Sequence, residues 1–168
     1  MSDTAVLVHV PEAEPVVGHW RLQHTYDAPR GIPPHVTLLF PWIPVEELTE
    51  EAEERLARMI GEAEPFEVAF ARAARWPDVL YLEPDPSEPF TELTGAIAAE
   101  WPEHPPYEGG HEIVMPHLTV AEGEDDLLEW IRVEVEPQLP VQTRIGEAKL
   151  YTEDETGRWH ERSRLPFA

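Results

Sequence analysis

The sequence contains one five-residue pattern twice, as PHVTL at residues 34–38 and as PHLTV at residues 116–120. In both copies a proline precedes a histidine, and a threonine follows two positions after the histidine. An imidazole, whose pKa is about 6.5, accepts a proton at neutral pH and donates one once it is protonated. A threonine hydroxyl donates hydrogen bonds to oxygens on which negative charge builds up. Two such pairs around one phosphorus atom indicate phosphodiester cleavage that needs no metal and no covalent intermediate.

The alternation of polar and apolar residues predicts that both copies are β-strands. Residues two apart in a strand point to the same side, so His35 and Thr37 would share one face, opposite Val36, Leu38 and Phe40. The second copy has the same parity. The prolines suit the first position of a strand, where no ladder donor is needed. If the halves of the chain are related by a pseudo-two-fold axis, the two polar pairs would face each other across a cleft.

Strand and helix patterns alternate along the chain, in the same order in both halves. In the first half we expect a strand at 5–10, a helix at 13–25, a loop at 27–34, a strand at 35–41, a helix at 46–61 and a strand at 66–73. In the second half we expect a strand at 79–83, a helix capped by Ser87 and reaching Trp101, a loop at 102–113, a strand at 117–121, a helix at 124–136, a strand at 141–151 and its hairpin partner at 158–164.

This repeated order predicts the fold class. We expect an α+β protein, a bilobal pseudo-two-fold duplication in which two antiparallel sheets line a central cleft and the helices lie outside. The length suits one domain over residues 1–168, with lobe-forming halves at about 1–75 and 76–168.

The composition excludes several kinds of chemistry. The chain has no cysteine, so disulfides, thiolate metal sites and cysteine nucleophiles are excluded together. No apolar run approaches the roughly 20 residues of a membrane-spanning helix. The first residues, MSDTAVLVHV, lack the basic and long apolar segments of a secretory signal. We therefore expect a cytoplasmic protein without a membrane partner.

The charge limits the size of the substrate. The formal net charge is −22, and Lys149 is the single lysine among twelve basic residues. Proteins that grip long nucleic acid neutralise phosphates with lysine and arginine, and this chain has few of either. We therefore expect a small nucleotide or short oligonucleotide as substrate, and weak binding of long RNA. We also expect the protein to be a monomer.

The sequence resembles the 2H phosphoesterase superfamily, also called the 2′-5′ RNA ligase or cyclic phosphodiesterase family. The likeness rests on the two His-x-Thr motifs, which are 82 residues apart, and on the phrases VPEAEPVVG, PHVTLLFPW and VLYLEPDPSEPF of a small bacterial branch. The resemblance implies that His35 and His117 are the general acid and base, and that Thr37 and Thr119 bind the phosphate. It further implies activity without a cofactor or metal on 2′,3′-cyclic phosphates, cyclic nucleotides or 2′-5′ linkages.

Other residues are candidates for binding the substrate. Arg30 and Tyr107 lie in loops that enter the motif strands, and such loops often carry function. Trp42 follows the first motif strand and could stack on a base. The remaining histidines carry less weight: His9 could line the cleft but suits a core or surface role better, His19 and His24 suit a helix surface, and His104 and His111 flank a loop that could form a lid.

Two rival interpretations stay open. A metallohydrolase could use some of the eight histidines, although the chain has no HExxH motif or cysteine-based ligand spacing. A binding module could hold a cyclic nucleotide or a phosphorylated partner with the same four residues and leave it unchanged. The metal-free phosphodiesterase is the interpretation that the duplicated motif favours.

Overall fold

The computed structural model describes residues 2–109 and 115–168, so His111 lies outside the described residues. In the described part of the chain there are eight strands and four α-helices. The strands are β1 (Thr4–His9), β2 (His35–Leu39), β3 (Phe66–Trp76), β4 (Val79–Asp85), β5 (Leu118–Glu122), β6 (Val141–Ile145), β7 (Glu147–Glu153) and β8 (Trp159–Pro166). The helices are α1 (Glu14–His24), α2 (Glu50–Ile60), α3 (Glu88–Glu100) and α4 (Asp125–Val135).

The strands form two antiparallel sheets of four. One sheet has the order β2-β1-β7-β8 and the other β5-β4-β3-β6. Strands β2 and β1 hold the same places in the first order as β5 and β4 in the second, and a helix, α1 or α3, joins the two strands of each pair. The predicted α+β class and the duplication with two antiparallel sheets are confirmed.

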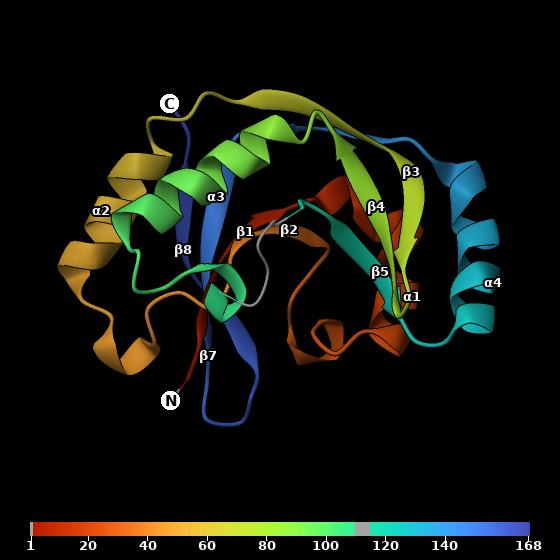
Figure 1. Ribbon diagram of the computed structural model, residues 1–168, viewed down its shortest axis with the longest axis horizontal. Helices are drawn as coiled ribbons and strands as arrows, with labels where there is room; N and C mark the ends of the chain where they lie inside the picture. Colours follow the sequence, from red (N-terminus) through yellow and green to blue (C-terminus); the bar gives the residue numbers. More distant parts are fainter. Residues whose placement is uncertain (1, 110–114) are drawn as a thin grey trace.

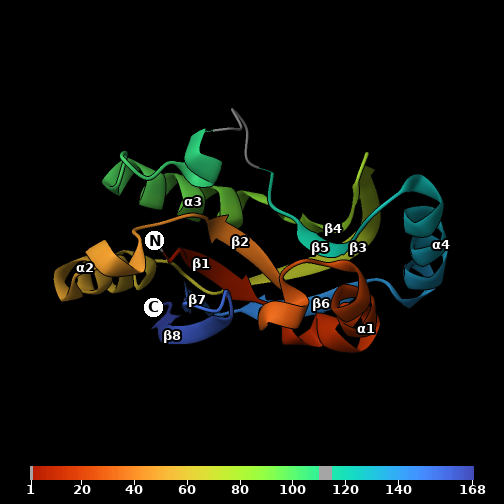
Figure 2. The ribbon, with the colours of Figure 1, turned by 90° about the horizontal axis from the view of Figure 1, so that it is seen from below.

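The helices cover one face of each sheet. Helices α2 and α3 pack on the sheet of β2 and β8, while α1 and α4 pack on the sheet of β4 and β5. Figures 1 and 2 show these two groups at opposite ends of the molecule, with α2 and α3 at one end and α1 and α4 at the other. None of the helices in residues 2–109 and 115–168 is long and apolar enough to cross a membrane.

The sheets exchange strands between the two halves of the chain, which corrects the predicted division at residues 75 and 76. Strand β3 pairs with β4, and β7 pairs with β1. The link between β3 and β4 is only two residues long, and a link of that length joins neighbouring antiparallel strands. Each sheet therefore contains strands from both halves.

The predicted single strand at 141–151 is also wrong. Residues 141–145 pair with β3 in one sheet, while residues 147–153 pair with β1 and β8 in the other. Gly146 stands between β6 and β7, at the point where the chain crosses from sheet to sheet. The hairpin partner that was predicted at 158–164 is confirmed as β8.

Helices α1, α3 and α4 lie within one or two residues of the predicted bounds, but the helix predicted at 46–61 begins only at Glu50, because Val45–Glu47 form a separate 3-10 turn. Helix α2 begins after Thr49, whose hydroxyl accepts a hydrogen bond from the Ala52 amide at 3.1 Å, and it ends at Gly61. Helix α3 begins after Ser87 as expected, but the Ser87 side chain makes no capping bond. Its backbone carbonyl instead accepts the Phe90 amide at 3.1 Å, so the predicted side-chain cap is wrong.

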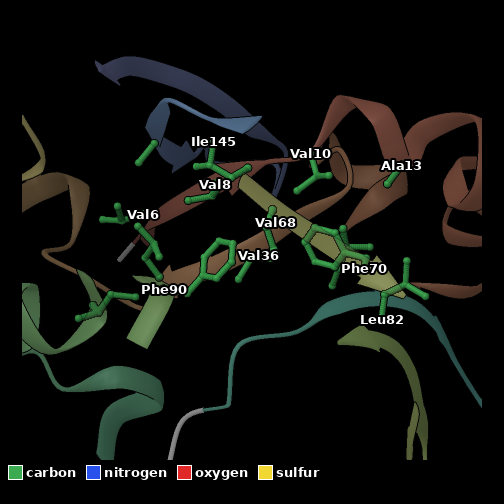
Figure 3. Packing of buried hydrophobic residues seen from close by; sticks show 14 of the residues in the cluster. Val6, Val8, Val10, Ala13, Val36, Val68, Phe70, Leu82, Phe90 and Ile145 are labelled. Carbon is green, nitrogen blue, oxygen red and sulfur yellow. The ribbon is translucent and has the colours of Figure 1, made fainter. Parts of the chain in front are cut away.

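One hydrophobic core extends across both sheets. Val6 and Val8 from β1 and Val68 and Phe70 from β3 belong to the same buried cluster, and Figure 3 shows these side chains within the core. Val36 and Leu38 of β2 and Leu118 and Val120 of β5 belong to this core, and Leu39 and Ala121 join it farther along each strand. The opposite face therefore carries the histidine and the threonine only at the start of each motif strand.

Phe40 departs from the predicted alternation. Strand β2 ends at Leu39, and Phe40 packs on a second, smaller cluster that includes Leu7 and Trp159. The Phe40 and Trp159 rings are 5.9 Å apart between centroids. Phe40 therefore does not share the face of Val36, because the strand has already ended.

Candidate active site

The first motif histidine begins strand β2 and is held by the backbone just before it. His35 is 8% exposed. Its Nδ1 atom is 2.8 Å from the carbonyl oxygen of Pro33. A carbonyl oxygen only accepts, so Nδ1 carries the proton and donates it. In the neutral imidazole, Nε2 is then the free acceptor.

The second motif histidine has the same arrangement. His117 directly precedes β5, and its Nδ1 atom is 2.8 Å from the carbonyl oxygen of Met115. The acceptor is again the residue two positions earlier. Both imidazoles therefore have the same tautomer, with Nε2 free to take a proton or, after protonation, to give one.

Both motif strands are edge strands, and they lie against each other. An edge strand leaves backbone groups without a strand partner. A helix side chain satisfies one such carbonyl on each motif strand: Thr94 of α3 donates to the Leu38 carbonyl at 2.6 Å, and Arg21 of α1 donates to the Thr119 carbonyl at 2.8 Å. The helix of each half thus binds the motif strand of the other half.

The environment holds both histidines neutral at pH 7. Burial is the largest cause that lowers the pKa of His35 to about 4, with Arg21 and His117 lowering it further and Asp27 opposing them. Burial also lowers the pKa of His117. A neutral imidazole with a free Nε2 is the form that a general base requires.

The depressed pKa of His35 predicts a loss of stability in acid. As the pH falls from 6.5 toward 4, the unfolded chain binds a proton at His35 that the folded protein excludes, so the free energy of unfolding falls. The expected loss from this group is about 3 kcal/mol, from the difference between the two pKa values. Urea unfolding at pH 6.5, 5.5 and 4.5 measures it, and His35→Gln is the comparison because glutamine does not titrate. Equal losses in both proteins would show that burial does not exclude the proton.

Tyr107 is one predicted contact that the structure brings to the site. Its hydroxyl shares a hydrogen bond with the Thr37 side chain, and burial raises its pKa. Its amide donates to the Phe40 carbonyl at 2.6 Å. The backbone of Tyr107 and Glu108 is left-handed, with φ of 51° and 56°, an arrangement that non-glycine residues seldom adopt. The chain is thus held in an unusual turn where Tyr107 meets the motif.

Arg30 is not brought to the motif residues by any contact in the described structure. Its Nη1 donates to the Tyr26 carbonyl at 2.7 Å, and its guanidinium lies 3.7 Å from the centre of the Tyr26 ring. These contacts hold it at the surface beside α1.

Trp42 cannot stack on a base, and that prediction is wrong. Its side chain is 1% exposed and belongs to the hydrophobic core. It packs edge-on against Trp101 at a centroid distance of 5.0 Å. The chain leaves β2 and turns inward, so a tryptophan only three residues past the strand is buried.

Two aromatic residues that the sequence analysis did not select surround His117. The ring centres of Trp76 and Tyr81 are 4.7 Å and 5.7 Å from the His117 ring. Trp76 ends β3, and Tyr81 lies in β4 opposite Thr119. The alternation in VLYLE could have identified Tyr81, because it places this residue on the opposite face of the strand from Leu80 and Leu82. No such signal marks Trp76.

A third overlooked residue, Asp27, lies beside His35. Its Oδ2 atom is 4.0 Å from His35 Nε2, and its Oδ1 atom pairs with Arg21 at 2.5 Å. His9, which lies opposite His35 in the β1–β2 register, is half-buried. Within the described ranges, no group of three or more His, Asp or Glu side chains is placed to hold a metal ion.

Paired His-x-Thr motifs on the adjoining edges of two strand-exchanged sheets define a two-histidine α+β protein. The chain belongs to the 2′-5′ RNA ligase superfamily, whose sequence model matches residues 9–157. Membership supports an enzyme of the 2H phosphoesterase type, with phosphodiesterase or RNA-ligase activity. A comparison with curated protein sequences gave no match.

Solved structures share the fold over nearly their whole length. Escherichia coli LigT complexed with 3′-AMP has a TM-score of 0.67 at 16% identity, covering 99% of this chain and 98% of that chain. LigT complexed with ATP has a TM-score of 0.64 at 18% identity, covering 100% and 99%. TT0787 of Thermus thermophilus has a TM-score of 0.60 at 19% identity, covering 99% and 97%. At these identities the likeness shows the fold alone.

Proposed function

We propose that the protein is a metal-independent phosphodiesterase that hydrolyses a small 2′,3′-cyclic phosphate, cyclic nucleotide or 2′-5′ linkage by two-histidine acid–base catalysis. One observation carries the proposal: both motif histidines donate Nδ1–H to a carbonyl two residues earlier, at 2.8 Å in each case. This fixes two equivalent imidazoles with Nε2 free, which is the requirement for one base and one acid. The family supports the same reaction class.

The burial of the two histidines suggests how the roles divide. His35 is the more buried, and its pKa is lowered to about 4, so it is neutral and suits the base that takes a proton from water. His117 is partly exposed and suits the acid that protonates the leaving oxygen. The water oxygen bonds to phosphorus as the bond from phosphorus to the ribose oxygen breaks. A bound phosphate anion favours protonation of an adjacent imidazole, which helps His117 to act as the acid.

The threonines and the aromatic residues supply binding. Thr37 and Thr119 share faces with their histidines, and their hydroxyls can donate to the non-bridging phosphate oxygens as charge builds there. Trp76 is partly exposed beside His117 and offers a surface on which a base can stack. Tyr107 bonds to Thr37 and would meet the same phosphate. LigT complexed with 3′-AMP and with ATP supports a small nucleotide as the ligand class.

We expect the purified protein to hydrolyse a 2′,3′-cyclic nucleotide or a 2′-5′-linked dinucleotide in excess EDTA, because the proposed acid and base are side chains. Chromatography of the products measures turnover, and the same protein dialysed against zinc or manganese is the control. Loss of activity in EDTA that either metal restores would contradict the metal-independent mechanism. Binding without turnover on every substrate would support a binding module instead.

A further inference from the structure

Arg21 is a buried arginine in the middle of the structure, although it lies on a helix whose neighbouring residues are largely exposed. Its side chain is 1% exposed. A buried charge needs a counter-ion and several hydrogen bonds to offset the loss of water. The contacts of Arg21 therefore indicate which parts of the backbone it holds in place.

The guanidinium contacts both motif segments. Nη1 donates to the carbonyl of Thr119 in the second motif at 2.8 Å. Nη2 donates to the carbonyl of Ile32 at 3.0 Å and is 3.5 Å from the carbonyl of Pro33. The Pro33 carbonyl is also the acceptor that orients His35. One planar group thus spans the backbone of both halves of the site.

Asp27 completes the arrangement as the counter-ion. Its Oδ1 accepts from Arg21 Nη2 at 2.5 Å, while its Oδ2 lies 4.0 Å from His35 Nε2. Thr25 also donates to Asp27 Oδ1, at 3.4 Å. The carboxylate neutralises Arg21 and at the same time sets the electrostatic environment of His35.

The geometry of guanidinium suits this position better than that of a lysine. Guanidinium is a flat fork whose donors point in fixed directions, whereas an ammonium is a point charge on a flexible stem. Only a fork can reach Thr119 with one nitrogen and the 32–33 segment with the other. The second half of the fold performs part of this task with a neutral side chain, since Thr94 bonds only to Leu38.

We propose that Arg21 is a positioning residue that sets the distance and orientation between the His35 and His117 imidazoles by tying the two motif segments together. The proposal rests on the function proposed above in that the two imidazoles act on one phosphate. In this positioning role, Arg21 contacts neither the phosphate nor the reacting atoms. Its effect passes through the carbonyls of Thr119 and of residues 32 and 33.

The test compares Arg21→Lys and Arg21→Gln with the matched changes Arg132→Lys and Arg132→Gln. Arg132 pairs with Glu129 and Glu136 on the surface of α4 and has no contact with the motifs. We expect kcat of Arg21→Lys to fall by about 10 to 100-fold with KM changed by less than about threefold, since displacement by about 1 Å disturbs the chemical step more than binding. The Arg132 variants should keep the kcat of the unaltered protein. If Arg21→Gln does not fold, Arg21→Lys decides, because its charge still faces Asp27.

A titration with inorganic phosphate separates this proposal from the proposed function, because it needs no turnover. NMR signals of the His35 and His117 rings should both shift in the unaltered protein and follow one binding curve. In Arg21→Lys we expect an affinity within about threefold of that of the unaltered protein, but altered sizes of the two ring shifts, because one imidazole is displaced from the phosphate. Arg21→Gln should in addition raise the pKa of His35. The substitution removes the arginine charge, which lowers this pKa, and leaves in place Asp27, which raises it, and His117, which lowers it. A folded Arg21→Lys with unaltered kcat and unaltered ring shifts would overturn the proposal. Phosphate that fails to shift both histidines of the unaltered protein would instead overturn the proposed function on which it rests.

Discussion

Replacing His35 or His117 by alanine is expected to lower kcat by about 10²–10⁴ in each case, the usual contribution of a positioned acid or base. The expectation rests on the matched hydrogen bonds to Pro33 and Met115, which leave each Nε2 free for proton transfer. Initial rates on the cyclic nucleotide that is turned over fastest measure the effect. His19→Ala is the control, because His19 is exposed on α1, away from both motifs.

The double variant His35→Ala/His117→Ala sharpens this prediction. The two imidazoles act on the same phosphate, so the combined loss should be far smaller than the product of the single losses. Circular dichroism and thermal melting establish that each variant is folded before its rate is interpreted. A folded His35→Ala protein with a near-normal rate would remove His35 from its assigned role.

The second large effect is expected for the threonines. Thr37→Val and Thr119→Val should each lower kcat/KM by about 10 to 1,000-fold, because valine keeps the shape of threonine but cannot donate to a charged phosphate oxygen. Competitive inhibition by inorganic phosphate provides an independent measure, and its inhibition constant should rise in both variants. Thr91→Val is the matched control, since Thr91 is exposed on α3 and its hydroxyl contacts only the Ser87 carbonyl.

The two threonine variants can also give different results. Thr37 already shares a hydrogen bond with Tyr107, whereas Thr119 lies opposite Tyr81 in the sheet. If Thr37→Val leaves both kcat/KM and phosphate inhibition unchanged while Thr119→Val does not, Thr37 serves to hold Tyr107 and is not a phosphate ligand.

The elements that carry the motifs could be predicted from the sequence because their signals are local. The alternation around His35 predicted that Val36 and Leu38 face the core, and the helical pattern at 46–61 predicted the end of α2 but not its start at Glu50. The double occurrence of the motif gave the duplicated architecture. Each of these inferences depends on residues within a few positions of one another.

The features that were missed depend on which segments meet in space. Both 141–145 and 147–153 alternate, and their sheets differ because the first segment pairs with β3 and the second with β1, both distant in the sequence. Trp42 looked accessible after a strand, but its burial is set by Trp101. Arg21 was not selected from the sequence, because its acceptors at Ile32 and Thr119 come together only in the folded protein.

Because each sheet takes strands from both halves of the chain, neither half could form a complete sheet by itself. In an isolated first half, β1 would lack its partner β7, and β3 would lack its partner β4. Two identical copies could satisfy both needs at once, each lending its last strand to the other's sheet, and would form a closed two-fold dimer. In this chain the two halves are covalently joined and differ in sequence, so an arginine in one half ties two segments together while a threonine in the other half performs only part of this task. The joined form brings both histidines together at any protein concentration, which a dimer of halves could not do on dilution.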